Sequence, residues 1–261
     1  MKIKNILISQ PCPAENEKSP YKDLAEKYNL KLGFNKFFKI EGVTSKEFRQ
    51  NRINLLDYSA VILTSKNAVD HYFRIAKEMR VDIPDTMKYF CVTDAIAFYL
   101  QKYVQYRKRK IFHGKLTFSD LMEVILKHKE EKFLFPCSDI HKQDMFKMLD
   151  KVSIRYAKAV LYKTVAADLQ DVDIKKYDML VLFSPSGVKS LFLNFPDFEQ
   201  EEIIIAGFGP TTHAAIKEAG LTLHIGAPTK TAPSMAMAIE EFIKKQAKAK
   251  KSTSASSEAK L

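Results

Sequence analysis

The chain has 261 residues, of which 46% are hydrophobic, and carries a formal net charge of +11. This length suffices for two modest domains, and the composition is ordinary for a globular protein. No apolar run is long enough to cross a bilayer, and residues 6–8 are too short for a signal-peptide core, so we expect a cytoplasmic protein. Three widely spaced cysteines, Cys12, Cys91 and Cys137, offer neither a disulfide framework nor a zinc motif.

The positive charge is unevenly distributed. Six lysines and a single acid lie in the final eighteen residues. The rest of the chain is still basic, which suits an acidic partner without identifying it. Because residues 246–261 are dominated by Lys, Ala and Ser and have no apolar face, we expect a disordered basic tail there.

Short apolar runs alternate with amphipathic helical patterns along the chain. We expect strands at residues 3–9, 60–63, 89–92, 111–113, 132–135, 179–183, 203–206 and near 223. Helices are expected at 21–28, from 42–45 through Ile53, at 68–79, 95–103, 118–127, 144–152, after residues 187 and 212, and at 233–245. Two weakly alternating segments, 32–40 and 157–165, are predicted to be extended linkers. The alternation of strand and helix indicates an α/β protein with parallel sheets.

Two polar turns follow buried strands in the second half of the chain. The first reads Ser184-Pro185-Ser186-Gly187, and the second is GFGPTT at 207–212. In an open α/β sheet such turns lie at the carboxyl ends of the strands, where these folds bind ligands. Amides at a helix start with hydroxyls beside them suit an anionic oxygen. Neither turn contains an acid, a base or a metal ligand, so they fit anion binding better than side-chain chemistry.

The chain contains an internal repeat. Residues 57–73 align with 176–192 at a constant offset of 119, which places Ser65 on Ser184 and Val69 on Val188. Three further blocks match more loosely in the same order. The pattern predicts two similar domains with a cleft between them; the alternative is a chance match.

Five motifs together resemble a known family. They are TSKNAV (64–69), LYKT (161–164), FSPSGV (183–188), GFGPTTHAAIKEAGL (207–221) and APTKTAPSMAMAI (227–239). Together they look like uroporphyrinogen-III synthase, and the resemblance runs over about residues 1–245. It implies two parallel-sheet α/β domains joined by two antiparallel extended linkers, with the N-terminal strand and helix completing the C-terminal domain. The domains would comprise 1–35 with 167–245, and 44–157, with linkers at 36–43 and 158–166.

Two positions depart from the pattern of that family. The family's first turn often carries Thr-Arg-Pro, where this chain has Ser9-Gln10-Pro11, so one anion contact is lost. In the first repeat the family often has a glycine before a threonine, where this chain reads CVTDA at 91–95. Asp94 argues against tight carboxylate binding at that turn.

The resemblance also implies a reaction, the ring closure of hydroxymethylbilane to uroporphyrinogen III. Water leaves to give an azafulvene, and the last pyrrole re-closes inverted through a spiro intermediate. No redox or group transfer occurs, so we expect a lyase without cofactor or metal. The partner would be a small-molecule anionic linear tetrapyrrole, which amides, hydroxyls and basic side chains complement. We expect a monomer that binds neither nucleic acid nor membrane. The alternative is a diverged, non-catalytic two-domain relative that binds a tetrapyrrole or another anionic ligand.

The resemblance assigns residues to this reaction. Tyr162 matches the tyrosine that the family places facing the cleft, and would donate a hydrogen bond to the departing hydroxyl; alternatively its ring only packs on the linker. The expected substrate-binding residues all lie in strand-to-helix turns: Thr64, Ser65, Asn67, Ser184, Pro185, Ser186, Gly187, Gly209, Thr211 and Thr212. Capping of the following helix is the structural alternative for these positions. His213 and the basic loop 107–110 are weaker candidates for substrate contact.

Other protein classes fit the sequence less well. The GFGPTT turn lacks the third glycine of a dinucleotide-binding loop, and no acid stands about twenty residues further on. The lysine-rich tail has no interleaved aromatic residues, which argues against a nucleic-acid-binding module.

Overall fold

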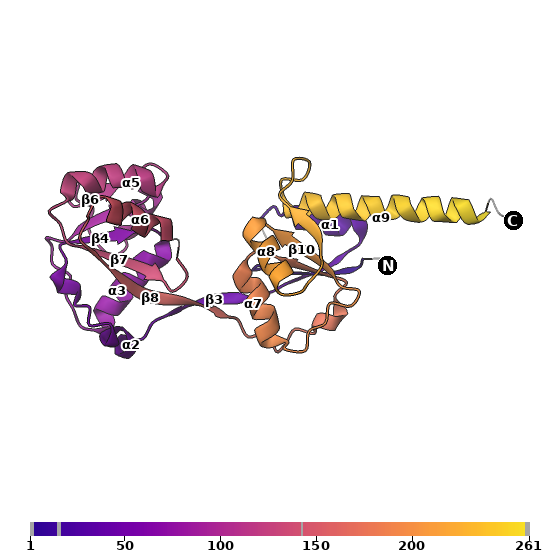
Figure 1. Ribbon diagram of the computed structural model, residues 1–261, viewed down its shortest axis with the longest axis horizontal. Coiled ribbons are helices and arrows are strands. Elements are labelled where there is room, and N and C mark those ends of the chain that lie inside the picture. Colours follow the sequence, from indigo (N-terminus) through magenta and orange to yellow (C-terminus); the bar gives the residue numbers. More distant parts are fainter. Residues whose placement is uncertain (1–2, 15–16, 142, 259–261) are drawn as a thin grey trace. The chain divides into compact units, whose positions relative to one another are not determined.

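The computed structural model describes residues 3–14, 17–141 and 143–258, with side chains described as far as Lys248. The chain divides into two compact units (Figure 1). The first comprises Met1–Lys39 together with Val165–Leu261, and the second comprises Ile40–Thr164. Each unit contains its own mainly parallel sheet with helices packed against it, so the predicted α/β class is confirmed.

The sheet of the first unit is built from both ends of the chain. Its order is β11-β10-β9-β1-β2, and the described pairings are parallel. The strands are β1 (Asn5–Ile8), β2 (Lys31–Phe34), β9 (Met179–Leu182), β10 (Ile204–Phe208) and β11 (Leu223–Ala227). Strand β1 lies between β2 and β9, so the N-terminal strand completes a sheet whose other members come from the C-terminal part.

Helices cover both faces of this sheet. They are α1 (Pro20–Tyr28), the short η3 (Ile174–Lys176), α7 (Pro185–Asn194), α8 (Pro210–Glu218) and α9 (Met235–Glu258). Along β1, Ile6 and Ile8 pack into a core with residues of α1 and α9, whereas Leu7 packs into a second core with residues of α7 and α8. Because successive side chains of a strand point to opposite faces, this split shows that the sheet is buried on both sides, which explains the continuous apolar runs.

The second unit repeats the design. Its sheet has the order β3-β8-β7-β4-β5-β6. The strands are β3 (Phe38–Gly42), β4 (Ala60–Leu63), β5 (Lys88–Cys91), β6 (Ile111–His113), β7 (Phe133–Ser138) and β8 (Tyr156–Ala166). The helices are α2 (Ser45–Gln50), η1 (Leu55–Asp57), α3 (Lys66–Glu78), α4 (Asp94–Leu100), α5 (Phe118–Ile125), η2 (Leu126–His128) and α6 (Gln143–Lys151). Strand β4 again alternates between two cores, with Val61 and Leu63 in one and Ala60 and Ile62 in the other.

Strands β3 and β8 carry the chain between the units. The Val43 N–H donates to the Leu161 carbonyl at 2.9 Å, and the Ala167 N–H donates to the Phe37 carbonyl at 2.9 Å. Residue numbers increase from 37 to 43 in the first segment while those of their partners decrease from 167 to 161 in the second, so the two segments run antiparallel. The two segments that were expected to be linkers, 32–40 and 157–165, also contribute strands to the sheets. The first part of the 32–40 segment forms β2, and β8 also pairs with β7 from Tyr156 to Tyr162, which buries Ala159 and Leu161.

The last helix, α9, is longer than the 233–245 expected. It begins after Ser234, whose Oγ accepts from the Met237 N–H at 3.3 Å, and ends at Glu258. Alanine and lysine have high helix propensity, which favours continuation of the helix through residues 246–251. The predicted disorder of residues 246–261 falls mostly on positions outside the described side chains, and stays a prediction. Within the described part of the chain, no helix has both the length and the apolar character that a membrane span requires.

Candidate functional site

The first group of predicted binding residues lies where β4 ends and α3 begins. Ser65 is the N-cap of α3, and its Oγ accepts from the Ala68 N–H at 3.1 Å. Thr64 is half-buried and Asn67 is exposed. The Oγ of Ser65 also lies 3.3 Å from the Oη of Tyr162. The fold therefore brings a predicted binding residue and the predicted catalytic residue into contact across 97 positions of sequence.

Tyr162 lies on β8 with its ring largely enclosed, at 7% exposure. The ring stacks on the imidazole of His71, with centroids 5.0 Å apart and an interplanar angle of 19°. Burial raises the pKa of Tyr162, while the hydrogen bond with Ser65 acts in the opposite direction. A phenol with a raised pKa keeps its proton at neutral pH, so Tyr162 can serve as a hydrogen-bond donor.

His71 was not singled out by the sequence. Its Nδ1 lies 3.0 Å from the Nε of Arg74. An arginine N–H can only donate, so His71 Nδ1 is the acceptor and the ring carries its proton on Nε2. Burial lowers the pKa of His71, as does the Arg74 charge, against the opposing charges of Asp70 and Glu78. Tyr162 is thus stacked on a neutral imidazole.

The turn between β9 and α7 is built in the same way as the turn after β4. Ser184 is the N-cap of α7, and its Oγ accepts from the Gly187 N–H at 3.1 Å. The backbone at Ser184 (φ −158°, ψ 156°) nearly equals that at Ser65 (φ −157°, ψ 163°). Pro185, at the first helical position, is exposed, and Ser186 is exposed to an intermediate degree. The two turns that the repeat aligns therefore share one conformation and one capping bond.

The turn between β10 and α8 differs because no side chain caps it. Gly209 is the N-cap with φ 89°, and a Cβ added there would meet no atom within 4 Å. The first helical residue is a proline, and two threonines follow it. Thr211 is exposed, whereas Thr212 is buried, with only 1% exposure. The first amides of a helix have no intrahelical partner and lie at the positive end of its dipole. The open part of this turn is therefore Gly209, Thr211 and the amides, while the Thr212 hydroxyl is enclosed.

His213 has a structural role that the sequence did not indicate. Its Nε2 lies 2.8 Å from the Gly207 carbonyl, which can only accept, so the imidazole donates. A Cβ on Gly207 would come within 3.1 Å of the His213 ring, and one on Gly226 within 3.3 Å. The absence of side chains at Gly207 and Gly226 therefore lets the imidazole pack against β10 and β11. His213 is engaged in this contact and in its hydrogen bond with Gly207.

The first turn of the chain also lies at the carboxyl edge of the first sheet. Ser9 is buried, and its Oγ lies 3.9 Å from the position that a Cβ of Gly187 would take. Gln10 follows it and lines a cavity of about 420 Å³ together with Tyr21 and Phe34. Sequence reasoning noted the missing arginine at Gln10 but assigned nothing to Ser9. The sequence did contain an indication of a role for Ser9, because it follows a buried strand directly, in a position similar to that of Ser184.

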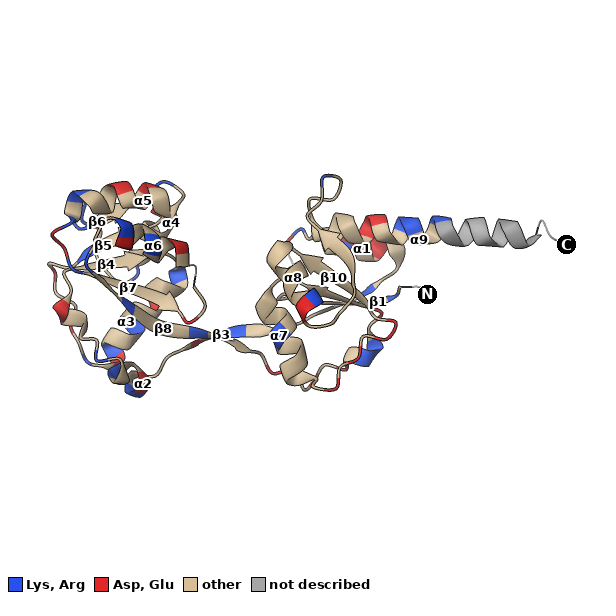
Figure 2. Cartoon of the chain, in the orientation of Figure 1, with Lys and Arg blue, Asp and Glu red and all other residues tan. Residues whose placement is uncertain are grey.

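Lysines lie on both strands that connect the units (Figure 2). They are Lys39 on β3, and Lys158 and Lys163 on β8. Lys163 is paired with Glu47, and the Nζ of Lys158 lies 3.9 Å from the centroid of the Phe146 ring. Lysine side chains therefore share β8 with Tyr162, although the charge of Lys163 is already paired with that of Glu47.

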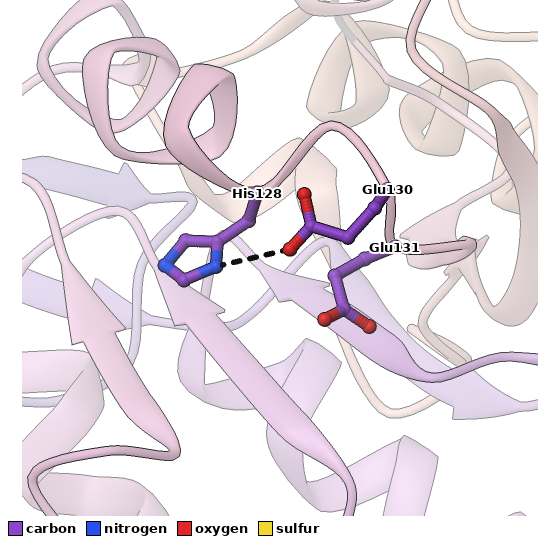
Figure 3. Close-up of side chains that lie close together, drawn as sticks. All are labelled: His128, Glu130 and Glu131. Atoms are coloured by element: carbon purple, nitrogen blue, oxygen red, sulfur yellow. Dashed lines mark ion pairs between the residues drawn. The ribbon is translucent and has the colours of Figure 1, made fainter.

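One group among the described residues has the donor set of a metal site. Donor atoms of His128, Glu130 and Glu131 all lie within 4.8 Å of one another (Figure 3). However, the Nζ of Lys88 lies 2.5 Å from Glu131. Burial raises the pKa of Glu131, but its hydrogen bonds with Lys88 and Ser59 outweigh this effect and keep that pKa below its ordinary value. The ammonium of Lys88 already neutralises this carboxylate, so the cluster fits an ion pair better than a metal centre.

Comparisons with known proteins identify a related family and related folds. The family model of uroporphyrinogen-III synthase HemD matches residues 37–237. The solved uroporphyrinogen-III synthetase from Helicobacter pylori 26695 is similar over 93% of this chain and 99% of its own, with a TM-score of 0.54 and 15% identity. A mutant uroporphyrinogen III synthase from the extremely thermophilic bacterium Thermus thermophilus gives a TM-score of 0.50 with the same coverage and identity. At this identity the two structures show the fold alone. A comparison with curated protein sequences gave no match.

Proposed function

Because the chain belongs to the uroporphyrinogen-III synthase family, we propose that it cyclises hydroxymethylbilane to uroporphyrinogen III, with inversion of the terminal ring and loss of water. The observation that carries this proposal is the family match over residues 37–237, which includes residues of both compact units. The serine-capped turns at Ser65 and Ser184 support it, because one such turn stands at the carboxyl edge of each sheet.

The turns are proposed to hold the carboxylates of the substrate. A serine hydroxyl that accepts from a backbone amide keeps its own proton free to donate. Ser184 can therefore cap α7 and bind a carboxylate oxygen at the same time. The uncapped amides of Thr211 and Thr212 and the open space at Gly209 suit a second carboxylate. Thr64, Asn67, Pro185, Ser186 and Gly187 would complete these contacts.

Tyr162 is proposed to assist the departure of the hydroxyl. If Ser65 donates to the Tyr162 oxygen, the phenol proton is free to bind the leaving group of the bilane. The hydroxyl leaves as water, the azafulvene forms, and ring closure follows without any group transfer. A general-acid contribution is of the order of 10²–10⁴ in rate, and holding the flexible chain in one attack geometry can contribute more.

We propose that the protein acts as a cytoplasmic monomer without a nucleic-acid or membrane partner. Its domains would be residues 1–35 with 167–245, and residues 44–157.

The test is an isomer assay. Purified protein is mixed with freshly generated hydroxymethylbilane, and the uroporphyrin isomers are separated by chromatography after oxidation. Bilane that closes spontaneously gives isomer I, so formation of isomer III above the protein-free control supports the enzyme. If only isomer I forms although the bilane binds, the chain is the non-catalytic relative instead.

A further inference from the structure

Arg74, on α3, uses its whole guanidinium group in contacts within the second unit. Its Nε donates to His71 Nδ1 at 3.0 Å, and its Nη1 donates to Glu78 Oε1 at 2.5 Å. Its Nη2 donates to two backbone carbonyls, that of Val43 at 2.8 Å and that of Leu161 at 3.1 Å. Those two residues are themselves joined by the bond from the Val43 N–H to the Leu161 carbonyl. One side chain thus ties α3 to the end of β3 and to β8.

Gly42 gives an independent sign that this contact is built into the sequence. A Cβ at Gly42 would lie 2.6 Å from Cζ of Arg74, and 2.7 Å from its Nε and Nη2. These distances are far below a van der Waals contact. The close approach of the β3 backbone to the guanidinium therefore requires a residue without a side chain.

Tyr162 is held at two points by this arrangement. Its backbone follows directly on Leu161, whose carbonyl accepts from Arg74. Its ring stacks on His71, whose orientation is set by the bond from Arg74 Nε. Ser65 meets the remaining polar end of the side chain, the hydroxyl.

We propose that Arg74 is a positioning residue for the ring closure, which fixes the backbone of Tyr162 through the Leu161 carbonyl and the ring of Tyr162 through His71. The inference rests on the proposed function of Tyr162. It does not require Arg74 to touch the substrate. Lysine cannot replace it, because only the planar guanidinium presents Nε and two Nη donors in a fixed fork.

The kinetic test is a double-mutant cycle in the full chain. Arg74→Met should lower kcat roughly 10- to 100-fold, the scale of a small misplacement of a reacting group, with a much smaller change in KM. Arg74→Lys should recover little of this loss. In a Tyr162→Phe background, Arg74→Met should have much less effect, because the group it positions has already lost its donor. Equal effects in both backgrounds would overturn the proposal.

Two further variants separate positioning from general stability. Arg49→Met removes an exposed arginine in the last turn of α2, on a different helix from Arg74, and it should leave kcat unchanged. Gly42→Ala keeps Arg74 but displaces its guanidinium, so it should reproduce part of the loss in kcat. Thermal unfolding is measured for each variant. If Arg74→Met does not fold, Arg74→Lys and Gly42→Ala decide, and wild-type kcat in both would refute the proposal.

A readout without turnover separates this inference from the proposed function. In ¹⁵N NMR spectra of the wild-type protein, His71 should show a protonated Nε2 and an unprotonated Nδ1. In Arg74→Met, the Nδ1 signal should lose the shift caused by the hydrogen bond, and His71 should titrate at higher pH, since Asp70 and Glu78 would act on it without the opposing charge. An unchanged His71 spectrum would overturn the role of Arg74, even if the protein makes no isomer III. A changed spectrum with no isomer III would refute the proposed function and leave only the contact.

Discussion

Replacing Tyr162 by phenylalanine isolates its hydroxyl from its ring. The ring contacts with His71 and the core of the second unit remain, and only the 3.3 Å interaction with Ser65 is lost. This distance exceeds the usual O–H···O range, so its net contribution should be near the lower limit for a hydrogen bond, about 0.5 kcal/mol. Ser65 still accepts from the Ala68 N–H and is not left without a partner. A fall in Tm of about 1–2 °C is expected.

The effect of Tyr162→Phe on catalysis should be much larger. If the phenol donates to the departing hydroxyl, kcat for isomer III should fall by at most about 10²–10⁴, which corresponds to roughly 3–5 kcal/mol of transition-state stabilisation. The assay measures initial rates of isomer III at saturating bilane, with the wild-type protein measured in parallel. A variant that makes isomer III at the wild-type rate would show that Tyr162 only packs on β8. Catalysis would then depend on geometry and backbone donors.

Three other predictions address binding, acid stability and the tail. Ser184→Ala should cost about 1 kcal/mol through loss of the α7 cap, and Ser184→Gly only a few tenths; both should raise KM, and equal stability of the alanine and wild-type proteins in urea would contradict the capping role. Hydrogen bonds from Lys27, then Lys244, lower the pKa of Glu240 to about 2 from 4.5. Because this carboxylate has a depressed pKa in the folded protein, its contribution is present above about pH 4.5 and is lost as the pH falls towards 2. Urea midpoints of Glu240→Gln should therefore depend less on pH in that window than those of the wild type, and parallel curves would refute this. Truncation after Lys245 should leave Tm and turnover unchanged, whereas a clear loss of either would give the lysines a further role.

Local patterns in the sequence were sufficient to predict the other strands, most helices and the serine-capped turns, whereas β2, β3 and β8 overlap the two segments that were expected to be extended linkers. A buried strand followed by a hydroxyl residue and an amphipathic helix is specified within about ten residues, so Ser65 and Ser184 could be found without a structure. The place of β1 inside the C-terminal sheet depends on pairing between Ile6 and Met179, which are far apart in the chain, and only the family resemblance suggested it.

Contacts between distant elements could not be read in this way. His71 and Arg74 meet β8 because α3 packs beside it, and nothing local to either segment specifies that contact. The enclosed Thr212 is different, because a signal was present. It is followed four residues later by the buried Ile216, which places both on one face of α8. The Thr212 hydroxyl is therefore on the buried face of α8, which leaves Thr211 as the exposed threonine of the pair.

The position of β1 between β2 and β9 has a consequence for how the chain folds during synthesis. Residues Ile40–Thr164 are continuous in sequence and leave the ribosome together, whereas β1 has no partner on one edge until β9 has been made. An unpaired strand edge favours association with other chains. We therefore expect stalled nascent chains from which residues up to about 170 have emerged to show a protease-resistant second unit and a protease-sensitive N-terminus. A chaperone could shield this N-terminal segment until β9, β10 and β11 have been made.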